Sequence, residues 1–396
     1  MASTPLPLVI VGAGLAAWTT VREVRKLDAA RPIVLISSDS ADFYAKPTLS
    51  NALAQKRSVD QLVTTPAAKM AETLQVQLLA HTHVRSLDTA ARSLRVEDSQ
   101  AQVHTLRYSD LVMATGADPI RLPLAGNAAQ RVQSINHLQD LAVFHTALGA
   151  APKTVLVIGA GLIGCEFAND LLIGGHSVHV VDPAPRPLAL LIPPAAGQQL
   201  QAALQAQGAL WHLGTTVHGL DTDAPTGRLK ATLADGTTLQ VDAVLSAVGL
   251  RAHTALASAA GVACERGIVV DAHLQTNAPH VYALGDCAQY AGAGARVLPY
   301  VMPIMNAAKA LAANLAGQAA ELVFPLMPVA VKTPALPIVV AAPHPDQSGT
   351  WAQDADLDPA DGGAWRFVDA AGQQRGFVLT GKQTVRRMEM AKTTVL

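Results

Sequence analysis

Two short glycine-rich stretches with the same spacing constrain the fold of this chain most. They consist of Gly12, Gly14 and Ala17 near the N-terminus, and of Gly159, Gly161 and Gly164 in the middle of the chain. In this pattern the first glycine makes a tight turn out of a buried parallel strand, and the second lets a pyrophosphate approach the N-terminus of the next helix. We therefore expect two strand–helix–strand units, each able to bind a dinucleotide.

A third pattern lies toward the C-terminus. Thr276 precedes the run Val281-Tyr-Ala-Leu-Gly-Asp286, which is typical of a strand that ends in a Gly-Asp turn. By itself Asp286 could be a simple structural cap. Together with the two glycine loops, it indicates a flavoprotein that takes hydride from a nicotinamide.

Composition excludes several classes of protein. Of the 396 residues, 50% are apolar and 15% are charged, and the formal net charge is −1, so we expect compact α/β domains and no nucleic-acid partner. We find no apolar segment that could insert into a membrane and no secretory signal. The three cysteines form no Cys-x-x-Cys pair, which favours a cytoplasmic location.

The order of the motifs predicts that one domain is inserted in another. Prolines at 119 and 123 follow the first unit, and the chain returns to it near residue 247. We expect a first domain of residues 1–118 and 247–323, an inserted domain of residues 119–246, and a small domain of strands and a basic helix at 324–396.

Seven segments give the chain a family resemblance: residues 43–47, 114–117, 159–170, 246–251, 283–288, 300–303 and 331–334. With them the sequence resembles the FAD-dependent pyridine nucleotide reductases, and among these the rubredoxin reductases. The resemblance implies two Rossmann-like domains arranged as in glutathione reductase, with a small α+β C-terminal domain. Non-covalent FAD would occupy the first domain and NADH, the electron donor, the inserted one.

The resemblance also assigns residues to FAD. These are Gly12, Gly14 and Leu15 at the pyrophosphate, Ser37 and Ser38 at the ribose, Val84 at the adenine, Thr115, Asp286 at the ribityl chain, and Val301 and Lys332 at the ring. The family often has an acidic residue where Ser37 and Ser38 stand, and Asp39 follows one position later. Lys332 could instead be an ordinary surface lysine.

NADH would bind at the second loop, through Gly159, Gly161 and Gly164, with Gly249 at its nicotinamide half. Asp182 follows the next strand at about the 20-residue spacing expected for a carboxylate on the adenosine ribose. A carboxylate there repels a 2′-phosphate and favours NADH, whereas the nearby Arg186 could accept that phosphate.

Lys46 and Glu166 are the predicted catalytic residues. Lys46 precedes Pro47, which restricts its backbone, and we expect Glu166 in the first turn of the helix after Gly164. In related reductases such a Lys and Glu pair beside the flavin, where the lysine stabilises the reduced ring. The alternative is two ordinary charges, with Glu166 completing a helix cap.

Cysteine and histidine positions exclude other chemistry. Disulfide reductases of this superfamily have two cysteines just after the first strand–helix–strand unit, but residues 40–60 contain none. We therefore expect electrons to leave the flavin directly, and Cys165 and Cys287 to be small core residues. His81 and His83 are two residues apart, as metal ligands on a strand can be, but no further ligands lie nearby and we expect no metal.

The resemblance names rubredoxin, a small acidic iron protein, as the electron acceptor, supplying an alkane hydroxylase or an oxygen- or peroxide-detoxifying enzyme. Lys382, Arg386, Arg387 and Lys392 form either its docking face or a solvated helix face. Two alternatives remain: a ferredoxin reductase of a monooxygenase system, and an NADH-switched flavoprotein like apoptosis-inducing factor.

Overall fold

The computed structural model describes residues 5–355 and 357–395, and the chain divides into two compact units. Unit 1 comprises Met1–Ala45, Val63–Asp118 and Leu250–Pro325. Unit 2 comprises Lys46–Leu62, Pro119–Gly249 and Leu326–Leu396. Each unit thus contains one of the two glycine loops, and the finer division into three domains stays a prediction.

Unit 1 is built on a parallel sheet of five strands in the order β21-β9-β1-β2-β5. β1 (Leu8–Val11) lies between β2 (Ile33–Ile36) and β9 (Asp110–Met113), and every residue of β1 and β2 is buried. Strands covered on both faces need apolar residues throughout, which explains the unbroken runs LVIV and IVLI. The outer strands are β5 (Gln77–Leu79) and β21 (Val281–Ala283).

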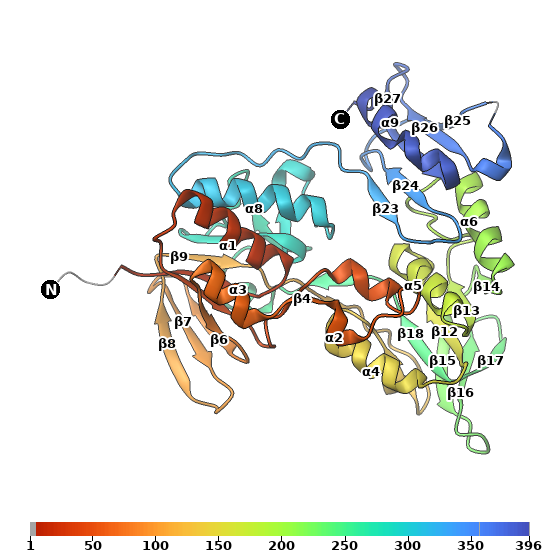
Figure 1. Cartoon of the computed structure of the whole chain (residues 1–396), viewed down its shortest axis with the longest axis horizontal. Coiled ribbons are helices and arrows are strands. Elements are labelled where there is room, and N and C mark those ends of the chain that lie inside the picture. Colours follow the sequence, from red (N-terminus) through yellow and green to blue (C-terminus); the bar gives the residue numbers. More distant parts are fainter. Residues whose placement is uncertain (1–4, 356, 396) are drawn as a thin grey trace. The chain divides into compact units, whose positions relative to one another are not determined.

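Two long helices of unit 1 pack against each other, α1 (Leu15–Leu27) and α8 (Val301–Leu315) (Figure 1). Pro303 lies in the first turn of α8. The remaining elements of the unit are β3 (Phe43–Tyr44), β4 (Val63–Thr65), α3 (Ala67–Leu74), β6 (His83–Asp88), β7 (Ser93–Glu97), β8 (Val103–Arg107), α7 (Ala255–Ala259), β20 (Ile268–Val270), η3 (Gly285–Cys287), β22 (Ala288–Tyr290) and η4 (Ala291–Ala293). β10 (Ala117–Pro119) and β19 (Leu250–Ala252) lie where the chain passes between the units.

Unit 2 repeats this plan with a parallel sheet in the order β11-β18-β12-β13-β14. β12 (Thr154–Ile158) takes the place of β1, followed by α5 (Leu162–Ile173) and β13 (Ser177–Asp182). Around them lie η1 (Lys46–Asn51), α2 (Val59–Leu62), η2 (Ala129–Arg131), β11 (Val132–Gln133), α4 (Leu138–Leu148), α6 (Pro194–Ala206), β14 (Leu210–Leu213), β15 (Val217–Thr222), β16 (Leu229–Leu233), β17 (Thr238–Val241) and β18 (Ala243–Ser246). Both sheets are accompanied by a three-stranded antiparallel sheet, β6-β7-β8 in unit 1 and β15-β16-β17 here.

The C-terminal part of unit 2 is an antiparallel sheet in the order β23-β24-β27-β26-β25 with a terminal helix. Its elements are β23 (Val329–Val331), β24 (Ile338–Ala341), β25 (Thr350–Gln353), η5 (Pro359–Asp361), β26 (Ala364–Val368), β27 (Gln374–Thr380), η6 (Gly381–Arg386) and α9 (Arg387–Thr393). Gly236 and Gly372 lie in the turns of two hairpins, β16–β17 and β26–β27. None of the helices within residues 5–355 and 357–395 combines the length and apolar character that crossing a bilayer requires.

Candidate nucleotide sites and a buried carboxylate cluster

The two glycine loops have the same backbone geometry. Gly12 and Gly159 adopt φ values of +112° and +105°, which side chains rarely tolerate. Their N–H groups each donate to the end of the neighbouring strand at 2.8 Å, Gly12 to the carbonyl of Ile36 and Gly159 to that of Val181. The sequence pattern therefore predicted both turns correctly.

Two of the glycines are required by close backbone contacts within the protein, and two others border open space that a ligand could occupy. A Cβ at Gly12 would lie 2.1 Å from the Ala114 carbonyl oxygen, and one at Gly159 would lie 2.7 Å from that of Ala247. At Gly14 and Gly161, by contrast, no atom lies within 4 Å of a Cβ. These two glycines are the N-caps of α1 and α5, so open space adjoins free N–H groups that favour a phosphate. Both loops fit a dinucleotide pyrophosphate.

The third position of the pattern differs between the loops. A Cβ at Gly164 would lie 1.9 Å from the Gly159 carbonyl oxygen, whereas Ala17 carries a real Cβ and is fully buried. α5 therefore packs more closely on its turn than α1 can.

The strand ends next to the loops are also unlike each other. The Asp182 carboxylate accepts the N–H groups of Ala160, in the second glycine loop, at 2.6 Å and of Ala184 at 2.7 Å. In unit 1 the buried Ser37 hydroxyl donates to Asp39 at 2.6 Å, and Ser38 is exposed. Asp182 thus helps to shape the second loop, and the ribose contacts of these residues stay predictions.

The Gly-Asp motif lies beside the first loop. Gly285 has φ +81°, and a Cβ there would lie 2.9 Å from the Cβ of Ala16 at the start of α1, which brings Asp286 close to the first loop. The Thr276 hydroxyl donates to the Val281 carbonyl at 2.9 Å and closes the preceding turn. The contact of Asp286 with FAD stays a prediction.

The structure also places four further residues that were predicted to bind a cofactor. The Thr115 hydroxyl donates to the carbonyl of His253 at 2.9 Å. Val84 lies on β6, and Val301 is the exposed first residue of α8. Gly249 has φ +114°, and its carbonyl accepts the N–H of Ile120 at 3.1 Å. Their cofactor contacts stay predictions.

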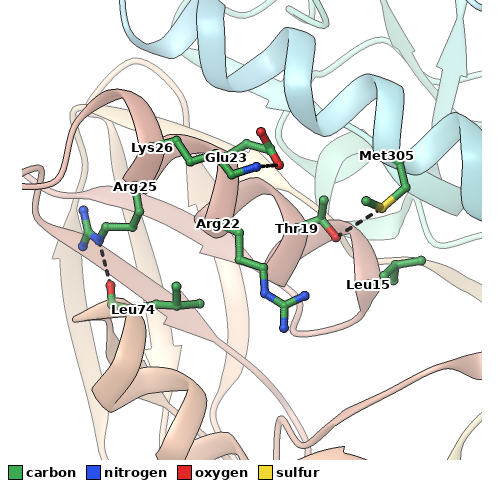
Figure 2. Close-up of a pocket in the computed structure, with 8 residues that line it drawn as sticks. All are labelled: Leu15, Thr19, Arg22, Glu23, Arg25, Lys26, Leu74 and Met305. Atoms are coloured by element: carbon green, nitrogen blue, oxygen red, sulfur yellow. Dashed lines mark hydrogen bonds and ion pairs between the residues drawn. The ribbon is translucent and has the colours of Figure 1, made fainter.

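A groove runs along one face of α1 in unit 1 (Figure 2). Its lining residues on α1 include Leu15, Thr19 and Arg22, and Met305 of α8 and Leu74 of α3 complete it. Of the residues predicted to contact FAD, Leu15 borders this groove.

Glu166 lies in the second turn of α5, one turn deeper than expected, so it is no helix cap. Its side chain is 0% exposed, and it forms an ion pair with the ammonium group of Lys332. The carboxylate also accepts the Ser50 hydroxyl at 2.6 Å and the backbone N–H of Lys332 at 2.9 Å. Burying a carboxylate is costly unless it is paired and hydrogen-bonded, and these three donors meet that requirement.

The structure gives Glu166 the cation Lys332, and the expected pairing of Glu166 with Lys46 stays a prediction. Lys46, at the start of η1, donates from Nζ to the buried Asn136 Oδ1 at 3.0 Å. Lys332 is only 30% exposed, so it is not the ordinary surface lysine of the alternative interpretation. The Ser50 bond nevertheless brings the Lys46 segment to Glu166.

Two more polar residues are buried on the same face of α5. Asp170 accepts the N–H groups of Leu53 at 3.2 Å and Ala54 at 2.7 Å, and it is 3% exposed. Asn169 accepts the N–H of Ala335 at 3.1 Å. Neither residue was predicted from the sequence, although their spacing of three and four residues after Glu166 places all three on one helix face.

Burial raises the pKa of the Asp170 carboxyl to about 6, although the two backbone N–H groups and the charge of Lys332 lower it. Burial likewise raises the pKa of the Cys165 and Cys287 thiols. Both cysteines are fully buried, as predicted for core residues. Within the described ranges, no group of three or more His, Cys, Asp and Glu side chains could hold a metal ion.

The chain is similar to known protein families and to named proteins. Residues 6–313 match the family described as Pyridine nucleotide-disulphide oxidoreductase, and residues 321–394 match a Rubredoxin binding C-terminal domain. A Rubredoxin-NAD(+) reductase of Alcanivorax borkumensis is 40% identical over 98% of both chains. One from Acinetobacter baylyi is 42% identical over 95% of this chain and 94% of its own.

Other relatives and solved structures agree. A Nitric oxide reductase FlRd-NAD(+) reductase of Aeromonas hydrophila is 38% identical over 95% of this chain and 93% of its own. The covalent putidaredoxin reductase–putidaredoxin complex matches with a TM-score of 0.86 at 23% identity, covering 98% of this chain and 93% of that one. A ferredoxin reductase from Rhodopseudomonas palustris matches at 0.87 and 24%, covering 98% and 95%. The shared fold confirms the predicted α/β class.

The two glycines of the second loop should separate folding from ligand binding. Gly161→Ala should leave thermal stability unchanged and weaken NADH binding at least about tenfold, because its methyl group occupies only ligand space. Gly159→Ala should also lower the free energy of unfolding, by about 1–3 kcal/mol or more, because of its positive φ and the Ala247 contact. Calorimetry and NADH titration measure both, and equal loss of stability in the two variants would contradict this division.

Asp170 should give the protein a distinctive pH dependence of stability. Because its pKa is raised in the folded state, its contribution is fully present below about pH 4 and is lost as the pH rises through about 6. Relative to Asp170→Asn, the free energy of unfolding of the wild type should fall by about 2–3 kcal/mol from pH 4 to pH 7. Urea unfolding at several pH values tests this, and a constant difference between the two proteins would refute it.

Proposed function

The chain belongs to the pyridine nucleotide-disulphide oxidoreductase family, and we propose that it is an FAD-dependent reductase that transfers electrons from NADH to rubredoxin. One observation carries the choice of acceptor: the match of residues 321–394 to a rubredoxin-binding domain. The relatives named Rubredoxin-NAD(+) reductase support it, since they align along almost the whole chain.

The two open glycine loops divide between the two nucleotides. In the proposal, FAD is held in unit 1 by the loop at Gly12 and Gly14 and by Asp286, and NADH binds in unit 2 at Gly159 and Gly161. When bound, FAD supplies the ability to accept a hydride as two electrons and to release them one at a time. Rubredoxin, an iron protein, requires such single electrons.

The protein's own contribution is to orient the nucleotides and to fix charge. Glu166 holds the Lys332 ammonium in place, and Asn136 holds that of Lys46. In the proposal both cations lie at the nicotinamide end of unit 2, where a fixed positive charge favours negative charge on a neighbouring ring. Asp182, beside the second loop, favours NADH over NADPH by repelling a 2′-phosphate.

Electrons are proposed to reach rubredoxin without a thiol relay. Cys165 and Cys287 are fully buried, and the half-buried Cys264 lies after α7 in unit 1. Burial raises the pKa of the Cys264 thiol as well, so none of the three is an activated thiolate.

The basic residues near the C-terminus differ in whether they form ion pairs with acidic side chains. Lys382 pairs with Asp361 at 2.6 Å, and Arg386 contacts Asp354 at 3.0 Å and Glu389 at 3.2 Å. These three ion pairs neutralise two of the four cations that the sequence suggested for docking.

Arg387 and Lys392 remain exposed and, within the described residues, unpaired with a carboxylate. Beside them Val385 is 83% and Met388 64% exposed. Exposed apolar side chains next to unpaired cations suit a transient contact with an acidic protein. We propose this part of η6 and α9 as the rubredoxin contact of the C-terminal domain.

The proposed setting is the cytoplasm, where NADH is available and free thiols persist. There rubredoxin would pass its electrons to an alkane hydroxylase or to an enzyme that removes oxygen or peroxide.

Anaerobic stopped-flow measurement tests the acceptor. The protein loaded with FAD is reduced by NADH and then mixed with oxidised rubredoxin or, in parallel, with a [2Fe–2S] ferredoxin. We expect fast, salt-sensitive bleaching of rubredoxin and slow reaction with ferredoxin. The reverse preference would identify a ferredoxin reductase, and reduction of neither would favour an NADH-switched protein.

A charge reversal tests the contact surface. Arg387→Glu should lower the second-order rate of rubredoxin reduction several-fold and flatten its dependence on ionic strength, because the variant repels an acidic partner. Lys230→Glu, on the exposed surface of β16, makes the same change in net charge and serves as the control. Equal effects of both substitutions would show that only the total charge matters.

A further inference from the structure

The segment that carries Lys46 is attached to α5 at two places. At its middle the Ser50 hydroxyl donates to Glu166 at 2.6 Å. At its end the N–H groups of Leu53 and Ala54 donate to the two oxygens of Asp170. At this second place the Leu53 side chain also packs next to the end of the helix, since a Cβ at Gly174 would lie 3.2 Å from its Cδ1.

Of the two attachments, the one at Asp170 depends more strongly on its hydrogen bonds. Among the described residues no cation forms an ion pair with its carboxylate, and burial raises the pKa of this group to about 6. Backbone N–H groups supply its hydrogen bonds. Hydrogen bonds to a charged acceptor are stronger than neutral ones. A buried carboxylate that accepts two successive N–H groups fixes the backbone direction at residues 53 and 54, and hence the η1 turn that precedes them.

We propose that Asp170 is a positioning residue for hydride transfer, which holds the Lys46–Ala54 segment on α5 so that Lys46 stays at Asn136 and Ser50 stays at Glu166. Asp170 itself touches neither nucleotide; it acts through η1. This inference rests on the proposed function, because it assigns Lys46 and Glu166 to the nicotinamide end of unit 2.

The neighbouring residue provides a matched control. Asn169 is equally buried on α5, but it accepts the N–H of Ala335, in the segment that follows Lys332, and donates to Gln207. Asp170→Asn retains the size of the side chain and one acceptor, but it turns an NH₂ group toward an N–H donor. Asn169→Ala removes the contacts to the other segment.

Hydrogen exchange followed by mass spectrometry gives a readout that does not depend on turnover. Asp170→Asn should raise exchange in residues 46–56 at least about tenfold and leave residues 330–338 unchanged. Asn169→Ala should do the reverse. Ser50→Ala, the second attachment of the same segment, should also raise exchange in residues 46–56, and it serves if Asp170→Asn does not fold.

The kinetic consequence is a separation of rate from affinity. With Asp170→Asn, the rate of flavin reduction at saturating NADH should fall about tenfold, while the Kd for NADH stays within about twofold, because the loop at Gly159 and Gly161 is intact. Faster exchange with an unchanged rate would overturn the positioning role and leave the proposed function standing. Unchanged exchange in residues 46–56 would overturn the attachment itself. Failure of NADH to reduce the wild-type flavin would overturn both proposals.

Discussion

Burial of negative charge on one helix governs much of unit 2. Glu166 and Asp170 are carboxylates inside the protein, and each would be strongly unfavourable there without donors. Those donors come from two segments far away in the chain, η1 with its following residues and the turn after β23. Removing one partner of such a buried charge typically costs about 3–5 kcal/mol. The hydrogen bonds that these two carboxylates require therefore hold both segments against α5. Each segment carries one of the two lysines of the proposed site.

The two units share a parallel sheet with a glycine loop but differ in the residues around that loop. Four strands follow the same order in both sheets, β9-β1-β2-β5 and β18-β12-β13-β14, and the fifth strand differs, because β21 is the last of its sheet in the chain and β11 the first. The two glycine turns have similar backbone angles, so a pyrophosphate would meet similar backbone in either loop. What differs is the surroundings: Ala17 against Gly164 at the helix, and Ser37 against Asp182 at the strand end. In the proposed arrangement either loop would bind a phosphate through its backbone, and side chains such as Ser37 and Asp182 would distinguish the two nucleotides.

Local features of the fold could be read from the sequence, but long-range pairing could not. The glycine turns, the strands at 8–11 and 177–181 and both hairpins follow from periodicity and turn chemistry. Lys46 was the partner expected for Glu166 and Lys332 was expected at the flavin ring, and the structure shows that Lys332, 166 residues away, forms an ion pair with Glu166. No local pattern distinguishes such candidates, because the choice depends on how β23 and η1 lie against α5. The roles of Asn169 and Asp170 were hidden for the same reason, although helical spacing could have grouped them with Glu166.

The burial of Cys165 and Cys287 affects how the protein resists oxidation in air. Cys165 donates to the Ala160 carbonyl at 3.3 Å inside the second glycine loop, and Cys287 donates to Leu284 at 3.3 Å beside the Gly-Asp motif. Both thiols stay protonated and enclosed, and peroxide reacts with thiolates that it can reach. A protein that handles reducing equivalents generates such oxidants whenever electrons leak to oxygen. Packing therefore shields the sulfur atoms beside the second glycine loop and the Gly-Asp motif from such oxidants.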